Sequence, residues 1–189
     1  MSKVILGQRN IQELEAAKFL PDNTVYYAAP LDFHLTYDKQ TKAHKERRTD
    51  SRLSWLNSAC GAVKDCNVIM LDPDNGLEIK TYPNLNQSKS GKYAYYSEVK
   101  KLFSDKAICV IYHHLNRTGS HQSQIQNRAD ELKQRVASKG SVFCIRFAPY
   151  SPRAYLILSK AREAKDIRAN LEIFMNSPCG IGWDSYYEV

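Results

Sequence analysis

The chain has 189 residues, and its composition, 43% hydrophobic and 25% charged, is typical of one globular domain that covers the whole of 1–189. Its 27 lysines and arginines outnumber 20 acidic residues, which gives a net charge of +7 and favours an acidic partner such as nucleic acid. The sequence has no apolar run near the roughly 20 residues of a membrane span, no secretory signal and no C-x-x-C pair, which predicts a cytoplasmic protein without a membrane partner, structural zinc or disulfides.

The first third of the chain predicts two short strands, a helix and a long basic loop. Apolar residues predict strands at 3–6 and 24–29, and an apolar stripe at helical spacing predicts a helix over 11–19. The basic segment 36–50 shows no apolar period and is therefore predicted to be a loop. Ser51 is a favourable N-cap residue, and the apolar stripe after it predicts that a second helix begins there.

The rest of the chain predicts a regular alternation of strands and helices. Apolar runs indicate strands at 67–71 and 106–112, the second of them long enough to be buried on both faces. The other expected elements are, in chain order, a loop over 83–91, a helix over 94–103, a helix from Ile125 to Val136 that stops at Gly140, hairpin strands over 142–147 and 154–158, a helix from Ala164 to Phe174 and an edge strand over 183–189.

This alternation predicts an α/β fold, namely a three-layer α/β/α sandwich with a mostly parallel sheet and a C-terminal antiparallel hairpin. In such sheets, ligands bind at the carboxyl ends of the strands. Two polar segments directly follow the predicted central strands, 72–76 after the first and 113–120 after the second. We therefore expect the two segments to meet at one edge of the sheet.

The first polar segment, Asp72-Pro73-Asp74-Asn75-Gly76, holds more polar groups than a simple turn needs. Asp72 is held stiffly because Pro73 restricts the backbone around it, whereas Gly76 allows a sharp turn or a close approach to a ligand. Asn75 offers the donor and acceptor pair that can read the edge of a base. We predict Asp72 as a catalytic carboxylate, with Asp74, Asn75 and Gly76 in a base pocket.

The second polar segment contains two adjacent histidines, His113 and His114. Neighbouring strand residues point to opposite faces, so one histidine is expected to face the site and to donate to a leaving group, and the sequence leaves open which one. Asn116 joins the predicted pocket. Arg117 can clamp a phosphate, and Ser120 opens a helix whose free N–H groups attract anions. No companion carboxylate supports a metal, so neither a metal nor a cofactor is expected.

Basic residues gather in two clusters, 42–52 and 89–101, and tyrosines interleave with them in the second. Basic side chains neutralise phosphates and aromatic rings stack on bases, so we predict DNA as the partner and Tyr93 as a residue of the base pocket. The sequence does not fix the oligomeric state, although a monomer is favoured. The predicted contacts to the DNA backbone are Arg47, Arg48, Arg52, Lys92, Arg117 and Ser120.

The motif Asp72-Pro73-x-x-Gly76 after an apolar strand resembles the D-P-Y-H-G water-activating loop of uracil-DNA glycosylases. The resemblance implies an α/β/α fold, Asp72 as the water-activating or cation-stabilising carboxylate, and a base flipped out of the duplex. The second loop of that family, H-P-S-P, is not reproduced in "HHLNRTG", and Asp74-Asn75 replaces Tyr-His, which favours a larger or modified pyrimidine. Size, charge and the run D-P-D-N-G-L-E also resemble bacterial phage-defence glycosylases that remove glucosylated hydroxymethylcytosine from phage DNA.

Three other interpretations stay open. "LDPDNG" also resembles the D-P-P-Y loop of S-adenosylmethionine-dependent amino-methyltransferases, but no G-x-G loop follows an early strand, so a methyltransferase-like scaffold without cofactor is a variant of this interpretation. A metal-dependent nuclease would use Asp74 with Glu78 and Lys80, although the first two are too close in sequence to lie on two strands. A nucleic-acid-binding module explains the charge but leaves Asp72 and Asp74 to repel phosphate.

Overall fold

The computed structural model describes residues 15–18, 20–31, 39–81 and 84–189. The strand expected at 3–6 and most of the helix expected over 11–19 lie outside the described residues. The segment 24–29 forms no strand in the part of the chain that is described, and it contacts a helix instead: the Tyr27 hydroxyl donates to the Trp55 carbonyl oxygen at 3.4 Å. The strand predicted there is therefore wrong.

The basic segment expected to be a loop is helical. Helix α2 spans Lys42–Ala62 and begins after Thr41, whose side chain accepts a hydrogen bond from the His44 N–H at 3.3 Å. The stripe of this helix that is buried against the protein consists of Arg48, Arg52, Leu56 and Ala59. The first two of these residues are arginines, so a search for periodic apolar residues could detect only the second half of the helix. The loop expected over 36–50 is therefore wrong from residue 42 onward, while 36–38 lie outside the described residues, and the N-cap expected at Ser51 is corrected to Thr41.

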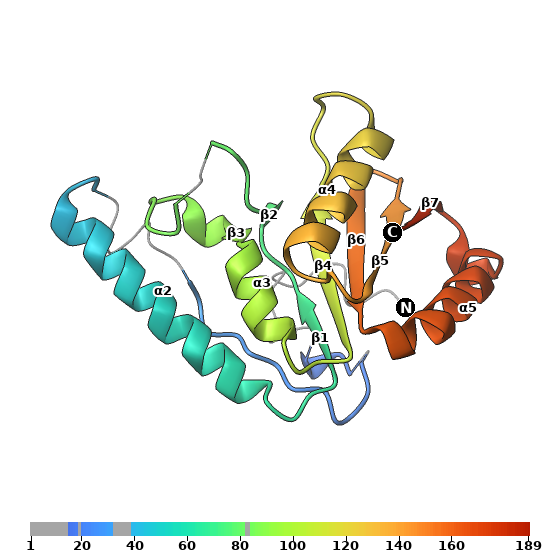
Figure 1. The fold of residues 1–189 in the computed structure, drawn as a ribbon, viewed down its shortest axis with the longest axis horizontal. Coiled ribbons are helices and arrows are strands. Elements are labelled where there is room, and N and C mark those ends of the chain that lie inside the picture. Colours follow the sequence, from blue (N-terminus) through green and yellow to red (C-terminus); the bar gives the residue numbers. More distant parts are fainter. Residues whose placement is uncertain (1–14, 19, 32–38, 82–83) are drawn as a thin grey trace.

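In the part of the chain that the structure describes, the main sheet has five strands in the order β1-β4-β6-β5-β7 (Figure 1). Only β1 and β4 pair in parallel, and the other three pairings are antiparallel, so the sheet is mixed and the expected mostly parallel sheet is wrong. The five residues 148–152 between β5 and β6 are too few for a parallel crossover, which forces the antiparallel turn. The strands are β1 Val68–Leu71, β4 Ile108–His114, β5 Ser141–Phe147, β6 Arg153–Ser159 and β7 Trp183–Glu188.

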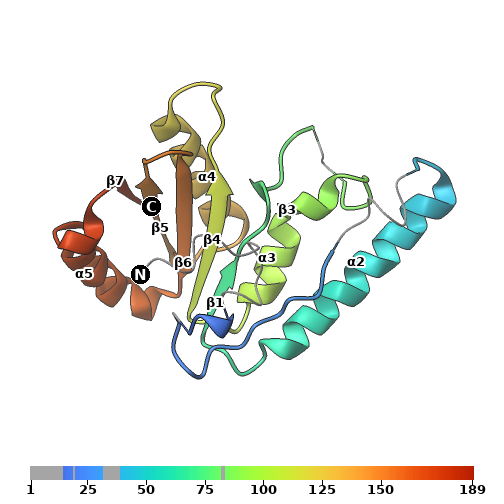
Figure 2. The same cartoon turned by 180° about the vertical axis from the view of Figure 1, so that it is seen from behind.

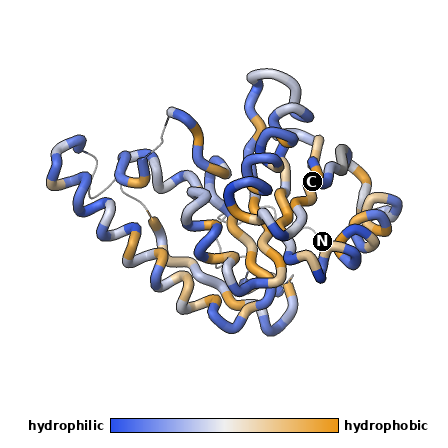
Figure 3. The backbone as a smooth tube through the Cα atoms, viewed as in Figure 1, coloured by the Kyte–Doolittle hydropathy of each residue, from blue (hydrophilic) through white to orange (hydrophobic). Residues whose placement is uncertain are grey.

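Two helices cover one face of this sheet. Helices α3, Tyr96–Phe103, and α4, His121–Arg135, each bury one apolar side, which for α4 is the i, i+4, i+7 stripe of Ile125, Ala129 and Leu132. Figure 3 shows hydrophobic stretches gathered where the strands lie. The sheet residues that belong to this core are Ile69, Cys109, Ile111, Val142, Cys144, Ala154, Leu156 and Leu158.

The opposite face of the sheet is covered in part by helix α5, Ala164–Met175. Ile167 and Leu171 of this helix are buried with Phe143 and Ile145 of β5. On this same face of β1, by contrast, Val68 and Met70 are 54% and 57% exposed. The cover therefore lies over the β5 side of the sheet.

The remaining elements are short. Gly76–Leu77, strand β2, pairs in parallel with β3, Tyr93–Ala94, and holds the chain after β1 against the chain before α3. Short 3-10 helices of a single turn are formed by Ser90–Lys92, Ala161–Glu163 and Pro178–Gly180. Among the described residues, no helix has the length and apolar character to cross a membrane.

Candidate functional site

The two polar segments predicted from the sequence meet at one edge of the sheet. β1 and β4 run in parallel, with Leu71 opposite Ile111, so both strands end on the same side. In Figures 1 and 2 the arrowheads of both strands point to one edge, which also carries the turn between β5 and β6. The expected juxtaposition of 72–76 and 113–120 is confirmed.

The pleat of the sheet assigns the side chains at this edge to two faces. Tyr112 lies opposite Tyr155 and His114 opposite Arg153, so these four side chains share the face that α3 and α4 do not cover. Asp72 directly follows β1, two residues after Met70, and it interacts electrostatically with Arg153 and Tyr155 of that face. We call the set Asp72, Tyr112, His114, Arg153 and Tyr155 the Asp72 face.

Contacts and charges tie the members of the Asp72 face together. The Tyr112 hydroxyl lies 3.4 Å from His114 Nδ1, and the centroids of the Tyr112 and Tyr155 rings are 5.9 Å apart. Partial burial raises the pKa of Asp72, the charge of Asp74 raises it further, and the guanidinium of Arg153 lowers it. The pKa of Tyr155 is raised mainly by burial; the charge of Arg153 lowers it and that of Asp72 raises it. A carboxylate, a guanidinium and an imidazole therefore surround two aromatic rings.

His113 lies on the other face of β4, where its side chain is buried. Its Nδ1 accepts a hydrogen bond from the Leu77 N–H at 3.0 Å, so in the neutral ring the proton is on Nε2. Burial lowers the pKa of His113 to about 3, helped by Arg128 and His114, so the ring stays neutral at physiological pH. His114 is thus the histidine that shares a face with Asp72, and the catalytic role considered for His113 is corrected to a structural one.

The turn after Asp72 is fastened to the segment before α3. The Asn75 N–H donates to the Lys92 carbonyl at 3.0 Å, the Glu78 N–H donates to the Ala94 carbonyl at 2.9 Å, and the Asp74 carboxylate pairs with the Lys92 ammonium at 3.4 Å. Asn75, Gly76 and the half-buried Tyr93, all predicted for the base pocket, therefore support this turn through their backbone.

Gly76 is a position where a side chain cannot fit. It has a φ of +96°, and a Cβ there would lie 2.2 Å from His113 Nδ1. We predict that Gly76→Ala lowers the free energy of unfolding by about 2–4 kcal/mol, from backbone strain and from the displaced hydrogen bond between Leu77 and His113. Urea denaturation measures the loss. Gly119→Ala is the matched control, because Gly119 has a φ of +80° but no heavy atom within 4 Å of its Cβ position; equal losses in the two variants would contradict the His113 contact.

The segment after β4 is held by its own polar groups. Asn116 Oδ1 accepts from the Thr118 N–H at 2.7 Å, and the Gln124 side chain bonds both Asn116 and Thr118. Ser120 caps helix α4 by accepting from the Ser123 N–H at 3.1 Å. The side-chain oxygens of Asn116 and Ser120 therefore serve this loop, while Arg117 is exposed.

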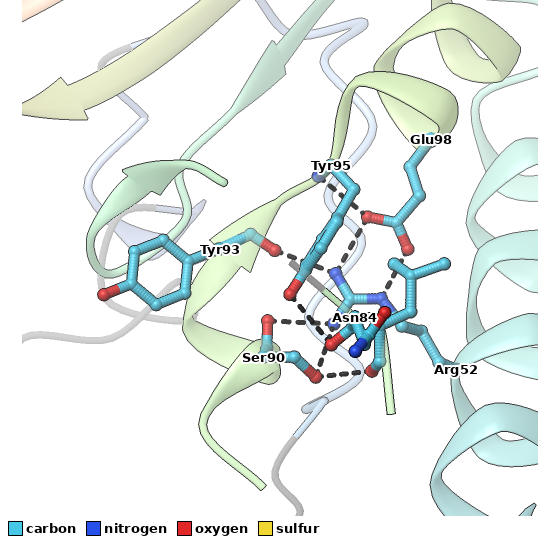
Figure 4. Close-up of polar contacts among 7 residues, drawn as sticks. Arg52, Asn84, Ser90, Tyr93, Tyr95 and Glu98 are labelled. Atoms are coloured by element: carbon cyan, nitrogen blue, oxygen red, sulfur yellow. Dashed lines mark hydrogen bonds and ion pairs between the residues drawn. The ribbon is translucent and has the colours of Figure 1, made fainter. Parts of the chain in front are cut away.

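Two of the arginines predicted to bind DNA are buried inside the protein. Arg52 is 3% exposed and holds Glu98 with two hydrogen bonds, at 2.5 and 2.8 Å, and also donates to the carbonyls of Ser90 and Tyr93 (Figure 4). Arg48 is 0% exposed and donates to the carbonyls of Asn86 and Lys39. Neither side chain can reach a phosphate, so these two assignments are corrected. Arg47, Lys92 and Arg117 are exposed.

The sequence pattern did not indicate Tyr112, Arg153 and Tyr155 as site residues. Arg153 and Tyr155 lie at the start of a strand. In a parallel sheet, the starts of the strands lie far from the edge where ligands bind, which is formed by the strand ends. Because β6 is antiparallel to β4, its start lies at the edge where β4 ends. The short connection 148–152 was the signal that could have placed them there.

A hollow of about 240 Å³ opens between the C-terminal ends of α2 and α3, and it includes none of the Asp72 face. Lys106 at its wall is 3% exposed, and its ammonium donates to the Lys64 carbonyl at 2.7 Å and to Asp105 at 3.1 Å. These bonds within the protein account for the polar groups there, so the Asp72 face is the better candidate site.

The Asp72 face can supply a negative charge, proton donors and stacking surface within one small area. No group of three or more histidine, cysteine or acidic side chains gathers among the described residues. Comparisons with models of protein families, with curated proteins and with solved structures give no match.

Proposed function

We propose that this protein is a DNA glycosylase that hydrolyses the N-glycosidic bond of a modified pyrimidine and leaves an abasic site. The observation that supports it best is the place of Asp72 at the end of β1, on the same face as Arg153, His114 and two tyrosines. The glucosylated hydroxymethylcytosine of phage DNA is the proposed base, in line with the resemblance of the 72–78 motif. A three-layer α/β/α arrangement is part of the same proposal.

Asp72 would act on the sugar. Departure of the base leaves positive charge on the sugar ring, and a fixed carboxylate beside it lowers the energy of that state and orients the attacking water. His114 would serve as the proton donor near the departing base, since it is exposed and its side chain lies on the same face of the sheet as Asp72. His113 would only support the turn.

The DNA backbone would lie along the edge that carries the polar loops. The exposed residues Arg47, Lys92 and Arg117 would neutralise phosphates, and the net charge of +7 would attract the duplex. This arrangement places the acidic Asp72 among basic side chains, which suits a catalytic centre better than a plain binding surface.

An excision assay tests this proposal. Phage DNA with glucosylated hydroxymethylcytosine and matched unmodified DNA are incubated with the protein in EDTA and then treated with alkali. Strand breaks that depend on alkali and on the modification are expected. No breaks in either DNA would overturn the proposal, as would breaks that require magnesium.

The pH dependence of turnover should identify Asp72 as the reacting carboxylate. Activity should fall as the pH falls through the pKa of Asp72, which lies above its ordinary value of 3.8. Because Arg153 lowers this pKa and Asp74 raises it, Arg153→Met should move the acidic limb of the rate profile to higher pH and Asp74→Asn should move it to lower pH. Profiles of kcat/KM over the acidic range measure both shifts, and a limb that stays in place in both variants would contradict the assignment.

A methyltransferase-like protein is the second candidate, because an antiparallel hairpin of β5 and β6 lies near one end of the sheet, with β7 beyond it. Saturable binding of S-adenosylmethionine in calorimetry would favour it. The nuclease interpretation is weaker, since Asp74 pairs with Lys92 and Glu78 pairs with Arg135 at 3.0 Å, so neither carboxylate is free to share a metal.

A further inference from the structure

Aromatic rings form a continuous row across four strands of the sheet. Tyr112 of β4 meets Tyr155 of β6 edge to face, Tyr155 lies 5.3 Å from Trp183 of β7, and Trp183 lies 5.2 Å from Phe147 of β5. Phe174 of α5 packs on Trp183 at 5.4 Å and fixes that end of the row. The row therefore starts under α5 and ends at Tyr112.

The Tyr112 end of the row lies beside β1, which is exposed on this face. The neighbouring strand β1 exposes Val68 and Met70 on this face, so the cover of α5 does not extend to it. Tyr112 and Tyr155 are half-buried, which leaves part of each side chain accessible. An aromatic surface that α5 covers at one end, and that stays partly accessible at the other, can receive a flat ligand there.

The rim of the row is polar and charged. Asp72, His114 and Arg153 border the two tyrosines, and Arg153 also lies over the Phe147 ring, with its Cζ 5.5 Å from the centroid. A core would not gather a carboxylate, an imidazole and a guanidinium around aromatic rings, because burying such groups unpaired is unfavourable. The tyrosine rings can stack on a flat heterocycle, and the cationic Arg153 beside them can donate to acceptor atoms on the edge of that heterocycle.

We propose that Tyr112 and Tyr155, with Arg153 at their rim, form a stacking site for one nucleobase beside Asp72. This inference deepens the proposed function, since it supplies the base pocket that 74–76, Asn116 and Tyr93 were expected to form. The O2 oxygen of a pyrimidine is attached next to the nitrogen of the glycosidic bond. A base stacked on Tyr155, with its sugar at Asp72, brings that oxygen to Arg153, which can take up the negative charge of the departing base.

Fluorescence of Trp183 reports on the site directly, because its ring contacts Tyr155. In a Trp55→Phe background, Trp183 is the only tryptophan of the chain. Deoxycytidine monophosphate is titrated as the probe, and deoxyribose phosphate, which lacks a base, is titrated in parallel. Saturable quenching by the nucleotide alone is expected. Equal binding of both compounds, or no quenching, would overturn the proposal.

Substitutions at Tyr155 separate stacking from folding. Tyr155→Leu keeps apolar volume but removes the ring, and it should weaken nucleotide binding by about 5- to 150-fold, the loss expected from one base–aromatic stack. Tyr155→Phe keeps the ring and should retain the affinity. Tyr150→Ala, at a side chain that is 100% exposed on the 148–152 turn, is the control that should change nothing. Far-UV circular dichroism checks each fold, and a Leu variant that binds as well as the Phe variant would contradict the stacking site.

The outcome is separable from that of the proposed function. Nucleotide quenching that depends on Tyr155, without base excision in the phage DNA assay, would sustain the stacking site and refute the glycosylase. Excision that persists unchanged in Tyr155→Leu, with no nucleotide quenching, would sustain the glycosylase and refute the stacking site.

Discussion

Asp72→Asn is expected to lower the rate of base release by about 10²–10⁴-fold, the range measured when one fixed charge or one acid–base group is removed from an active site. Asparagine keeps the shape of the side chain and removes only its charge. Binding of DNA should be unchanged or slightly tighter, since the substitution removes a negative charge from a basic surface. Single-turnover excision and equilibrium DNA binding, measured on the same preparation, give the two quantities.

Asp65→Asn is the matched control for this substitution. Asp65 is a highly exposed aspartate that pairs weakly with Lys64 at 4.0 Å, and it precedes β1, so it lies at the opposite end of that strand. The same loss of charge there should leave the excision rate within a factor of two or so of the wild type, as for a surface substitution. Equal rates in the two variants would show that Asp72 is not the catalyst. Loss of DNA binding in Asp72→Asn alone would instead favour a binding module.

The elements with a strong local pattern could be predicted from the sequence. The apolar runs before Asp72 and before His113 are β1 and β4, and the stripes of α4 and α5 match the expected helices closely. In each, the residues that face the core are apolar and recur at the period of the element. Their pattern is therefore complete within one segment.

The start of α2 could not be found in this way. Its buried stripe begins with Arg48 and Arg52, which become suitable core residues only because distant groups, such as Glu98 and the carbonyls of Ser90 and Tyr93, accept their hydrogen bonds. Those acceptors lie about forty positions further along the chain. A basic helix of this kind looks like a solvated loop to any test that counts apolar residues.

Only part of the site could be predicted, because the rest depends on contacts between distant segments. The meeting of Asp72 with the histidine segment follows from two parallel strands, which the sequence indicates. Which histidine joins Asp72, and that Arg153 and Tyr155 complete the face, depends on the register of β4 against β1 and β6. Register is a property of pairs of strands, and a shift by one residue would exchange His113 for His114.

Arg52→Met should lower the free energy of unfolding by about 3–5 kcal/mol, the usual loss when one partner of a buried ion pair is removed. The methionine can fill most of the space of the arginine stem but leaves Glu98, which is 6% exposed, with an uncompensated charge. The carbonyls of Ser90 and Tyr93 also lose their donors. Because a domain of this size has about 5–15 kcal/mol of stability in all, the variant should be close to unfolding at moderate urea concentrations.

Two comparisons distinguish the buried pair from a general effect of losing a cation on α2. Lys45→Met, at an exposed position of the same helix, should change the unfolding free energy by no more than about 0.5 kcal/mol. Adding Glu98→Gln to Arg52→Met should recover part of the loss, because the amide carries no charge yet can still accept the Tyr95 N–H bond at the start of α3. If Arg52→Met were no more sensitive to urea than Lys45→Met, the network would not be what holds the 84–93 segment to α2. The turn after Asp72 would then be held by the β2–β3 pairing, the Asp74–Lys92 ion pair and the Leu77–His113 hydrogen bond without help from Arg52.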